Sequence, residues 1–199
     1  FEFKDANIDV TIASINGGLI PVEPTPWFID TKEDKMFNKS AELTSLLTNS
    51  LSIEDVDFTE FDIVFLSGGW GAAYDLGFSE SLADKMFTAY ESGSLIGAIC
   101  HGVLGLINIK NKDGELLIKN RKMTGVTNKQ LQELGIFFTP MHPEDELKKA
   151  GVLFESKSKR IEFFANHVVV DDEERFITGQ NQNAGHEISQ KIMEILENE

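Results

Sequence analysis

Two short apolar runs, with an amphipathic stretch between them, most limit the folds open to this chain. Residues 61–66 and 95–99 are almost wholly apolar, which is typical of parallel strands buried on both faces. Residues 79–92 between them have helical spacing, and Gly93 ends this stretch. Its apolar face consists of Leu82, Met86, Phe87 and Tyr90. A strand, a helix and a second strand in this order predict an α/β fold with a mainly parallel sheet.

The remaining elements continue this alternation, with no internal repeat and no low-complexity linker. Three prolines, Pro21, Pro24 and Pro26, predict a surface loop over residues 15–30. Apolar spacing predicts helices over residues 38–49, 103–109, 128–134, 144–150 and 184–196. Further strands are predicted over residues 9–14, 116–118 and 122–126, and in a hairpin of residues 168–170 with 175–178. At about 150 residues per domain, we expect one domain spanning residues 1–199.

Composition excludes several classes of protein. The chain has 33 acidic and 18 basic side chains and a net charge of −15, which argues against binding to duplex nucleic acid. The apolar runs are far shorter than the ~20 residues that cross a bilayer, so we expect no membrane span. Cys100 is the only cysteine, which rules out a disulfide within the chain and a four-thiolate zinc site. We therefore expect a cytoplasmic protein.

The strongest chemical motif follows the second apolar run directly. Cys100-His101-Gly102 lies between a predicted strand and a predicted helix, which is the arrangement of a nucleophile elbow. A thiol at that turn projects above the carboxyl edge of the sheet, and the helix N-terminus favours its thiolate form. The alternative is that Cys100 is a small buried residue that ends a strand.

A glycine-rich turn, Ser67-Gly68-Gly69-Trp70-Gly71, follows the first apolar run and opens at the same sheet edge. Its backbone N–H groups could face an oxyanion beside the thiolate. A phosphate cradle is disfavoured because the sequence fits neither a P-loop nor G-x-G-x-x-G, and a plain glycine-rich turn is the other alternative.

A metal site is not predicted. His142, His167 and His186 do not lie at i, i+4 spacing, and we expect no metal and no other cofactor. Residues 171–174, four consecutive acidic residues, lack the alternating ligand spacing of a calcium loop and are predicted to be a solvated hairpin tip.

Three segments together resemble the ThiJ/PfpI superfamily. They are GGWGAAYDL at residues 68–76, AICHG at 98–102 and ITGQN at 177–181. Further similar text, including MTGVTN at residues 123–128, extends the resemblance nearly from end to end and is similar to the branch of heat-shock chaperones and glutathione-independent glyoxalases. The resemblance implies a class I glutamine-amidotransferase-like, flavodoxin-like three-layer sandwich.

The resemblance also implies roles for individual residues. Cys100 matches the family nucleophile, and His101 matches the histidine that acts as general base or acid. The N–H groups of Gly69, Trp70 and His101 match oxyanion-binding positions, and Gly68 belongs to the same substrate-binding turn. These roles imply a small aldehyde substrate, with methylglyoxal converted to D-lactate through a hemithioacetal and an enediol. A homodimer is expected by resemblance alone.

The sequence departs from the family pattern in three places. Trp70 stands where family members carry histidine. The stretch after the Thr-Gly-x-Thr strand, residues 128–132, has no carboxylate to orient His101, and Asn128 could hold the imidazole through its amide oxygen instead. A first strand and a glutamate that bonds the cysteine would precede the helix at which this chain begins, so we expect about thirty further residues upstream.

Three other functions remain open. Cys100 could be an oxidation target in a stress chaperone or a redox-sensing protein. An intracellular peptidase or amidase of the same superfamily is also possible. Glutamine amidotransferase activity is least favoured because His101 follows Cys100 directly.

Overall fold

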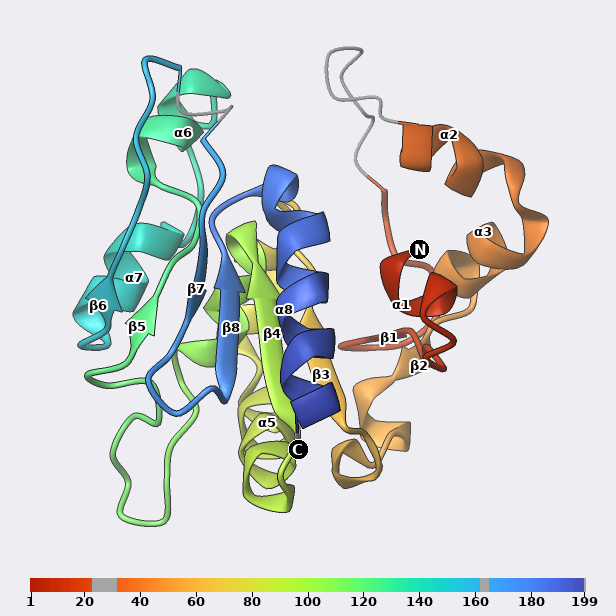
Figure 1. The fold of residues 1–199 in the computed structure, drawn as a ribbon, viewed down its shortest axis with the longest axis horizontal. Helices are drawn as coiled ribbons and strands as arrows, with labels where there is room; N and C mark the ends of the chain where they lie inside the picture. Colours follow the sequence, from red (N-terminus) through yellow and green to blue (C-terminus); the bar gives the residue numbers. More distant parts are fainter. Residues whose placement is uncertain (23–31, 162–164, 199) are drawn as a thin grey trace. The chain divides into compact units, whose positions relative to one another are not determined.

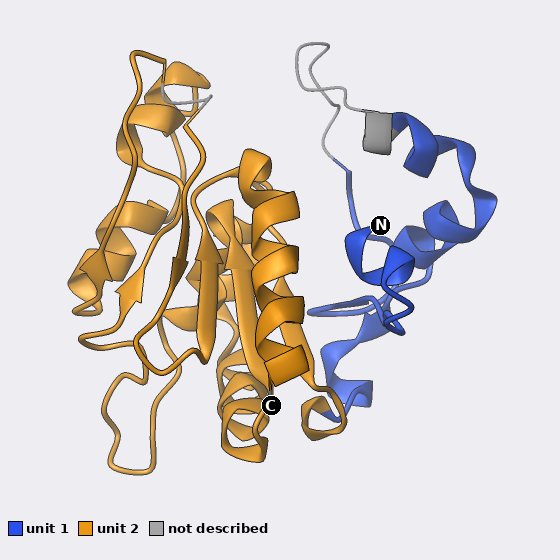
Figure 2. Cartoon of the chain, in the orientation of Figure 1, with its two compact units in different colours: residues 1–57 blue, residues 58–199 orange. Residues whose placement is uncertain are grey.

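The structure is a computed structural model that describes residues 1–22, 32–161 and 165–198 (Figure 1). The chain divides into two compact units, residues 1–57 and residues 58–199 (Figure 2). The first unit contains a small parallel sheet, and the second contains a larger sheet flanked by helices. In the described segments, each helix is too short or too polar to cross a lipid bilayer.

The first unit is built around two short parallel strands. Its elements are α1 (Glu2–Asp5), β1 (Ala13–Ser14), α2 (Lys32–Lys39), α3 (Ala41–Thr48), β2 (Leu51–Ser52) and the 3₁₀ turn η1 (Ile53–Asp55). Ser40 separates α2 from α3, and its Oγ accepts a hydrogen bond from the Leu43 N–H at 3.2 Å. The helix predicted over residues 38–49 is therefore two helices, and the strand predicted over 9–14 is confined to β1. Residues 23–31 of the predicted proline loop lie outside the described residues.

The second unit has a four-stranded sheet in the order β3-β4-β8-β7. Its strands are β3 (Ile63–Leu66), β4 (Leu95–Ile99), β8 (Phe176–Gly179) and β7 (Val168–Val170). The first three are parallel, and β7 pairs with β8 as the predicted antiparallel hairpin. In Figure 1, α8 (Gly185–Asn198) covers one face and α5 (Glu80–Ser92) lies on the other. The predicted three-layer α/β arrangement with a mainly parallel sheet is confirmed.

Shorter elements surround this sheet. They are η2 (Phe58–Glu60), α4 (Ala72–Asp75), η3 (Leu76–Phe78), η4 (Cys100–Leu106), α6 (Asn128–Glu133), α7 (Pro143–Lys149) and η6 (Gln182–Ala184). Two further short strands, β5 (Lys122–Met123) and β6 (Leu153–Phe154), form a parallel pair of their own.

Both ends of helix α5 lie where the sequence predicts them. The Ser79 Oγ accepts from the Leu82 N–H at 3.1 Å, and Gly93 takes the left-handed conformation that ends the helix. The buried face consists of Leu82, Ala83, Met86 and Ala89. Phe87 and Tyr90, predicted to lie on that face, are half-buried at its margin.

Four local predictions are wrong. Strand β3 is half-buried over its first three residues, because it lies at the edge of the described sheet. Residues 116–118 form a bridge and a turn rather than a strand, since the Leu117 carbonyl bonds to the Arg121 guanidinium. The predicted helix over 103–109 is the 3₁₀ helix η4, in which Gly105 lies against Leu66. The strand predicted over 122–126 is shorter than expected and consists of the two residues of β5.

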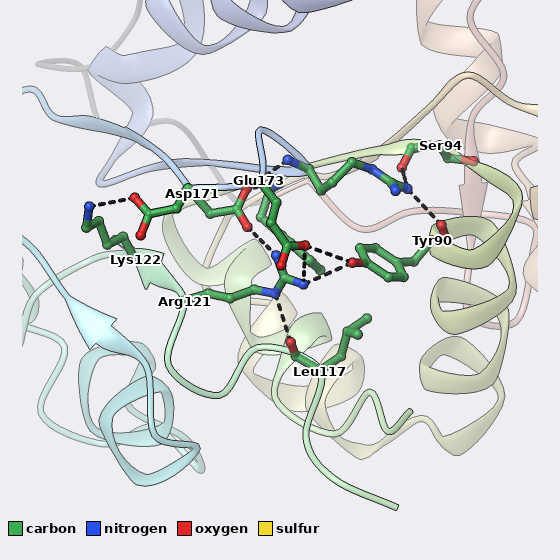
Figure 3. Close-up of polar contacts among 10 residues, drawn as sticks. Tyr90, Ser94, Leu117, Arg121, Lys122, Asp171 and Glu173 are labelled. Atoms are coloured by element: carbon green, nitrogen blue, oxygen red, sulfur yellow. Dashed lines mark hydrogen bonds and ion pairs between the residues drawn. The ribbon is translucent and has the colours of Figure 1, made fainter. Parts of the chain in front are cut away.

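The prediction of a solvated acidic hairpin tip is wrong for Asp171, which is buried and contacts Arg121 (Figure 3). Its carboxylate pairs with Arg121 and accepts the backbone N–H groups of Arg175 and Phe176, both at 2.8 Å. Arg121 also donates to Glu173 at 2.8 Å. Burial lowers the pKa of Arg121, but its hydrogen bonds to the two carboxylates raise this pKa further, so the guanidinium stays charged. This ion cluster fixes the hairpin to the turn before β5.

We expect Asp171→Asn to lower the free energy of unfolding by about 3 kcal/mol, because it leaves a mostly buried guanidinium without its main counter-charge. Glu173→Gln is the matched control and should cost less than about 1 kcal/mol, since Glu173 is 61% exposed. Urea unfolding of the three proteins at pH 7 measures both differences. Equal losses would contradict the central role of Asp171.

Candidate active site

Cys100 occupies a strained turn at the carboxyl end of β4. Its φ of 58° is in the left-handed region, which non-glycine residues rarely adopt. Gly102 makes the turn possible, because a Cβ at this position would lie 2.2 Å from the Leu66 carbonyl oxygen and 2.8 Å from that of Ser67. The backbone of the turn therefore rests directly on the end of β3, and the cysteine side chain is held at the sheet edge.

The glycine-rich turn after β3 forms the opposite wall. A Cβ on Gly68 would lie 2.8 Å from both the Cys100 Cβ and the Ile99 carbonyl oxygen, so the two turns touch. Gly69 has a φ of 103°, and its N–H bonds to the Cys100 sulfur, as does the N–H of His101. Trp70 is half-buried with its ring centroid 6.2 Å from that of Tyr74. The structure thus brings together Gly68, Gly69, Cys100 and His101.

The cysteine and the histidine form a neutral pair at pH 7. The Cys100 Sγ lies 3.5 Å from the His101 Nδ1. Burial raises the pKa of the Cys100 thiol to about 11 and outweighs the two N–H bonds that lower it. Burial, followed by the charge of His142, lowers the pKa of His101 to about 4. The predicted thiolate is therefore not the resting form. The helix that was expected to favour it is the single short 3₁₀ helix η4, and the desolvation of the buried thiol dominates.

Asn128 does not hold His101. Its side-chain N–H group donates to Asp145 Oδ1 at 2.7 Å, and its backbone N–H donates to Glu144 Oε2 at 2.8 Å. The first turn of α7 thus uses its carboxylates to bind the start of α6. The His101 Nε2 is buried and has no hydrogen-bond partner among the described residues. The Asn128 Oδ1, which was predicted to accept from His101, is likewise buried without a partner among the described residues, so the structure shows no hydrogen bond between the two side chains.

Two further buried polar residues were not singled out from the sequence. His142 is the residue before α7, and its Nδ1 is buried and unpartnered within the segments that the structure describes. Gln130 is fully buried in α6 and receives a hydrogen bond on Oε1 from the Asn181 amide at 3.4 Å. Pro143 marks the start of a helix and was a usable sign that His142 is fixed rather than in an open loop.

A cavity of about 250 Å³ opens beside α6 and α7. It is lined by Asn128, Leu131, Gln132, Ile136, Phe137, His142 and Asp145. In residues 1–22, 32–161 and 165–198, no group of three or more His, Cys, Asp or Glu side chains is placed to hold a metal ion.

Several proteins of similar sequence carry glyoxalase names. Glyoxalase 3 of Candida albicans is 30% identical over 76% of this chain, which spans 63% of that protein. The glutathione-independent glyoxalase HSP31 of Saccharomyces cerevisiae is 24% identical over 86% of this chain and 73% of its own length. Among solved structures, the Rapid Encystment Protein of Francisella tularensis is 31% identical, with a TM-score of 0.87 over 96% of this chain and 83% of that one.

The family model extends over both units. The sequence pattern of the DJ-1/PfpI family matches residues 2–195, so it includes the cysteine turn, the glycine-rich turn and the hairpin. The chain belongs to the DJ-1/PfpI family.

Proposed function

We propose that this protein is a cysteine-dependent, glutathione-independent glyoxalase that converts methylglyoxal to D-lactate. The observation that carries the proposal is the position of the Cys100 sulfur, which lies between the His101 imidazole and two backbone N–H donors. A carbonyl carbon that bonds to this sulfur would place its oxygen next to the N–H groups of Gly69 and His101. The names of the relatives support the same substrate class.

The neutral pair suits a reaction that begins with a proton transfer. The thiol proton passes to His101 Nδ1 as the sulfur attacks the aldehyde carbon, and the imidazolium then gives this proton to the alkoxide, which completes the hemithioacetal. A proton moves from the former aldehyde carbon to the neighbouring carbon through an enediol, which leaves a thioester of lactate. Water hydrolyses the thioester and regenerates the thiol. The overall change adds one water to methylglyoxal.

Gly68, Gly69 and Trp70 complete the proposed substrate site. Gly68 leaves room for the two turns to touch, Gly69 supplies a donor, and Trp70 forms an apolar wall in place of a histidine. We assign no catalytic role to Asn128. The proposal also includes a cytoplasmic location and a homodimer, for which a lone cysteine and the family membership are the support.

We expect the protein to release D-lactate from methylglyoxal without glutathione, and Cys100→Ala to lower kcat/KM by at least about 1,000-fold, because the nucleophile is removed. A stereospecific D-lactate dehydrogenase assay measures the product. Equal activity in the two proteins, or none in the natural one, would overturn the proposal.

The pH dependence of Cys100 alkylation tests the resting state. Because burial disfavours the charged thiolate, the rate with iodoacetamide should rise about tenfold per pH unit from pH 7 towards about 11. The same chain unfolded in urea should level off near pH 8.5, the ordinary range for a free thiol. A plateau below pH 8 in the folded protein would contradict the neutral pair.

Two glycines of the same turn provide a matched test of the site wall. Gly68→Ala should reduce kcat/KM by about 100-fold or more, because its Cβ would collide with Cys100 and the Ile99 carbonyl. Gly71→Ala should leave activity within about twofold, since nothing lies within 4 Å of its Cβ position. Similar losses in both variants would show that the contact between the turns is unimportant.

A further inference from the structure

The His101 ring has a buried nitrogen for which the proposed mechanism names no hydrogen-bond partner. The Cys100 sulfur already receives two backbone N–H groups, so the thiol proton must point to an acceptor, and His101 Nδ1 is 3.5 Å away. A neutral imidazole carries one proton, and in this tautomer the proton is on Nε2. His101 is only 2% exposed, and its Nε2 lacks a partner in the described part of the chain. A buried N–H donor without an acceptor costs about 1–3 kcal/mol.

His142 offers the complementary group. Its Nδ1 is also buried and unpartnered within the described ranges, and a neutral imidazole can use such a nitrogen as an acceptor. The two rings are close enough for the charge of one to act on the other. Helix α7, which begins directly after His142, packs against η4, which begins at Cys100.

The backbone contacts explain why His142 is held there. A Cβ on Gly125 would lie 3.4 Å from the Cys100 carbonyl oxygen and 3.4 Å from Leu147 of α7, so the helix reaches the base of the cysteine turn. Met141, next to His142, lies against Gly77 of η3. These contacts anchor the residue on both sides, while His142 borders the cavity of about 250 Å³, from which a water can reach its ring.

Two other buried polar groups could take this role. Gln130 Oε1 is occupied by Asn181, whose amide N–H group also donates to the Ala165 carbonyl. The Gln130 atom without a partner among the described residues is Nε2, a donor, which cannot accept the His101 Nε2–H.

The Asn128 N–H groups are bound by Asp145 and Glu144, but its Oδ1 is buried without a partner in the described ranges and borders the same cavity. Asn128 is therefore the competing acceptor, and unchanged proton exchange in His142→Leu would favour it.

We infer that His142 is the positioning residue of this site: its Nδ1 accepts the Nε2–H of His101 through one bridging water and holds the tautomer in which Nδ1 faces the thiol. His142 thus does the work that the missing carboxylate does elsewhere in triads of this kind. The inference rests on the proposed function where it concerns turnover, but the tautomer of His101 is a property of the free protein.

Two variants separate the acceptor from the shape of the side chain. His142→Leu removes the acceptor and should lower kcat for methylglyoxal at least about tenfold with KM within twofold. His142→Asn puts an amide oxygen near the Nδ1 position and should keep kcat within about threefold of the natural protein. Equal kcat in the natural protein and His142→Leu, or equal losses in both variants, would overturn the inference while leaving the proposed function intact.

A second measurement needs no activity. In protein labelled with ¹⁵N-histidine, the His101 ring is identified by the signals lost in His101→Gln. We expect Nε2 to carry a slowly exchanging proton in the natural protein and in His142→Asn, and this proton to exchange rapidly in His142→Leu. A proton on Nδ1 in the natural protein, or unchanged exchange in His142→Leu, would overturn the inference. If the natural protein makes no D-lactate, the proposed function fails and this spectrum alone decides the role of His142.

Discussion

The contact between the Gly102 backbone and the end of β3 is the constraint on which the site depends. A side chain at position 102 would collide with the Leu66 carbonyl. Because this residue is a glycine, the chain can reverse directly after β4 with Cys100 at a positive φ. This close approach in turn places the sulfur against the N–H groups of Gly69 and His101. Strain at one residue is thus supported by close packing at its neighbours, as is common where a fold presents a nucleophile.

Much of this arrangement could be predicted from the sequence. The apolar runs, the Ser79 and Gly93 caps and the hairpin are local signals, because each depends on residues close together in the chain. The pairing of Cys100 with His101 was also predictable, since the residues are adjacent. The glycine at position 68 was visible as a turn residue, although its contact with Cys100 depends on two strands lying side by side.

The rest depends on contacts between distant segments. Asn128 was a reasonable choice to orient His101, but no local pattern showed that Glu144 and Asp145 of α7 would bind its backbone and side-chain N–H groups. From the sequence, His142 was considered only as a possible metal ligand. Its proximity to His101 comes from the packing of α7 against η4, which no local pattern encodes. Asp171 was similarly assigned to a solvated tip, because its partner Arg121 lies 50 positions away.

The neutral thiol–imidazole pair also bears on how this protein survives oxidants. Peroxide oxidises the thiolate rather than the thiol, and a thiol with a pKa near 11 supplies very little thiolate at pH 7. A carbonyl compound can still react, because it accepts the proton that His101 receives from the thiol as the bond to sulfur forms. Burial of the thiol should therefore slow the oxidation of Cys100 more than its reaction with a carbonyl compound, because only the latter takes up the thiol proton.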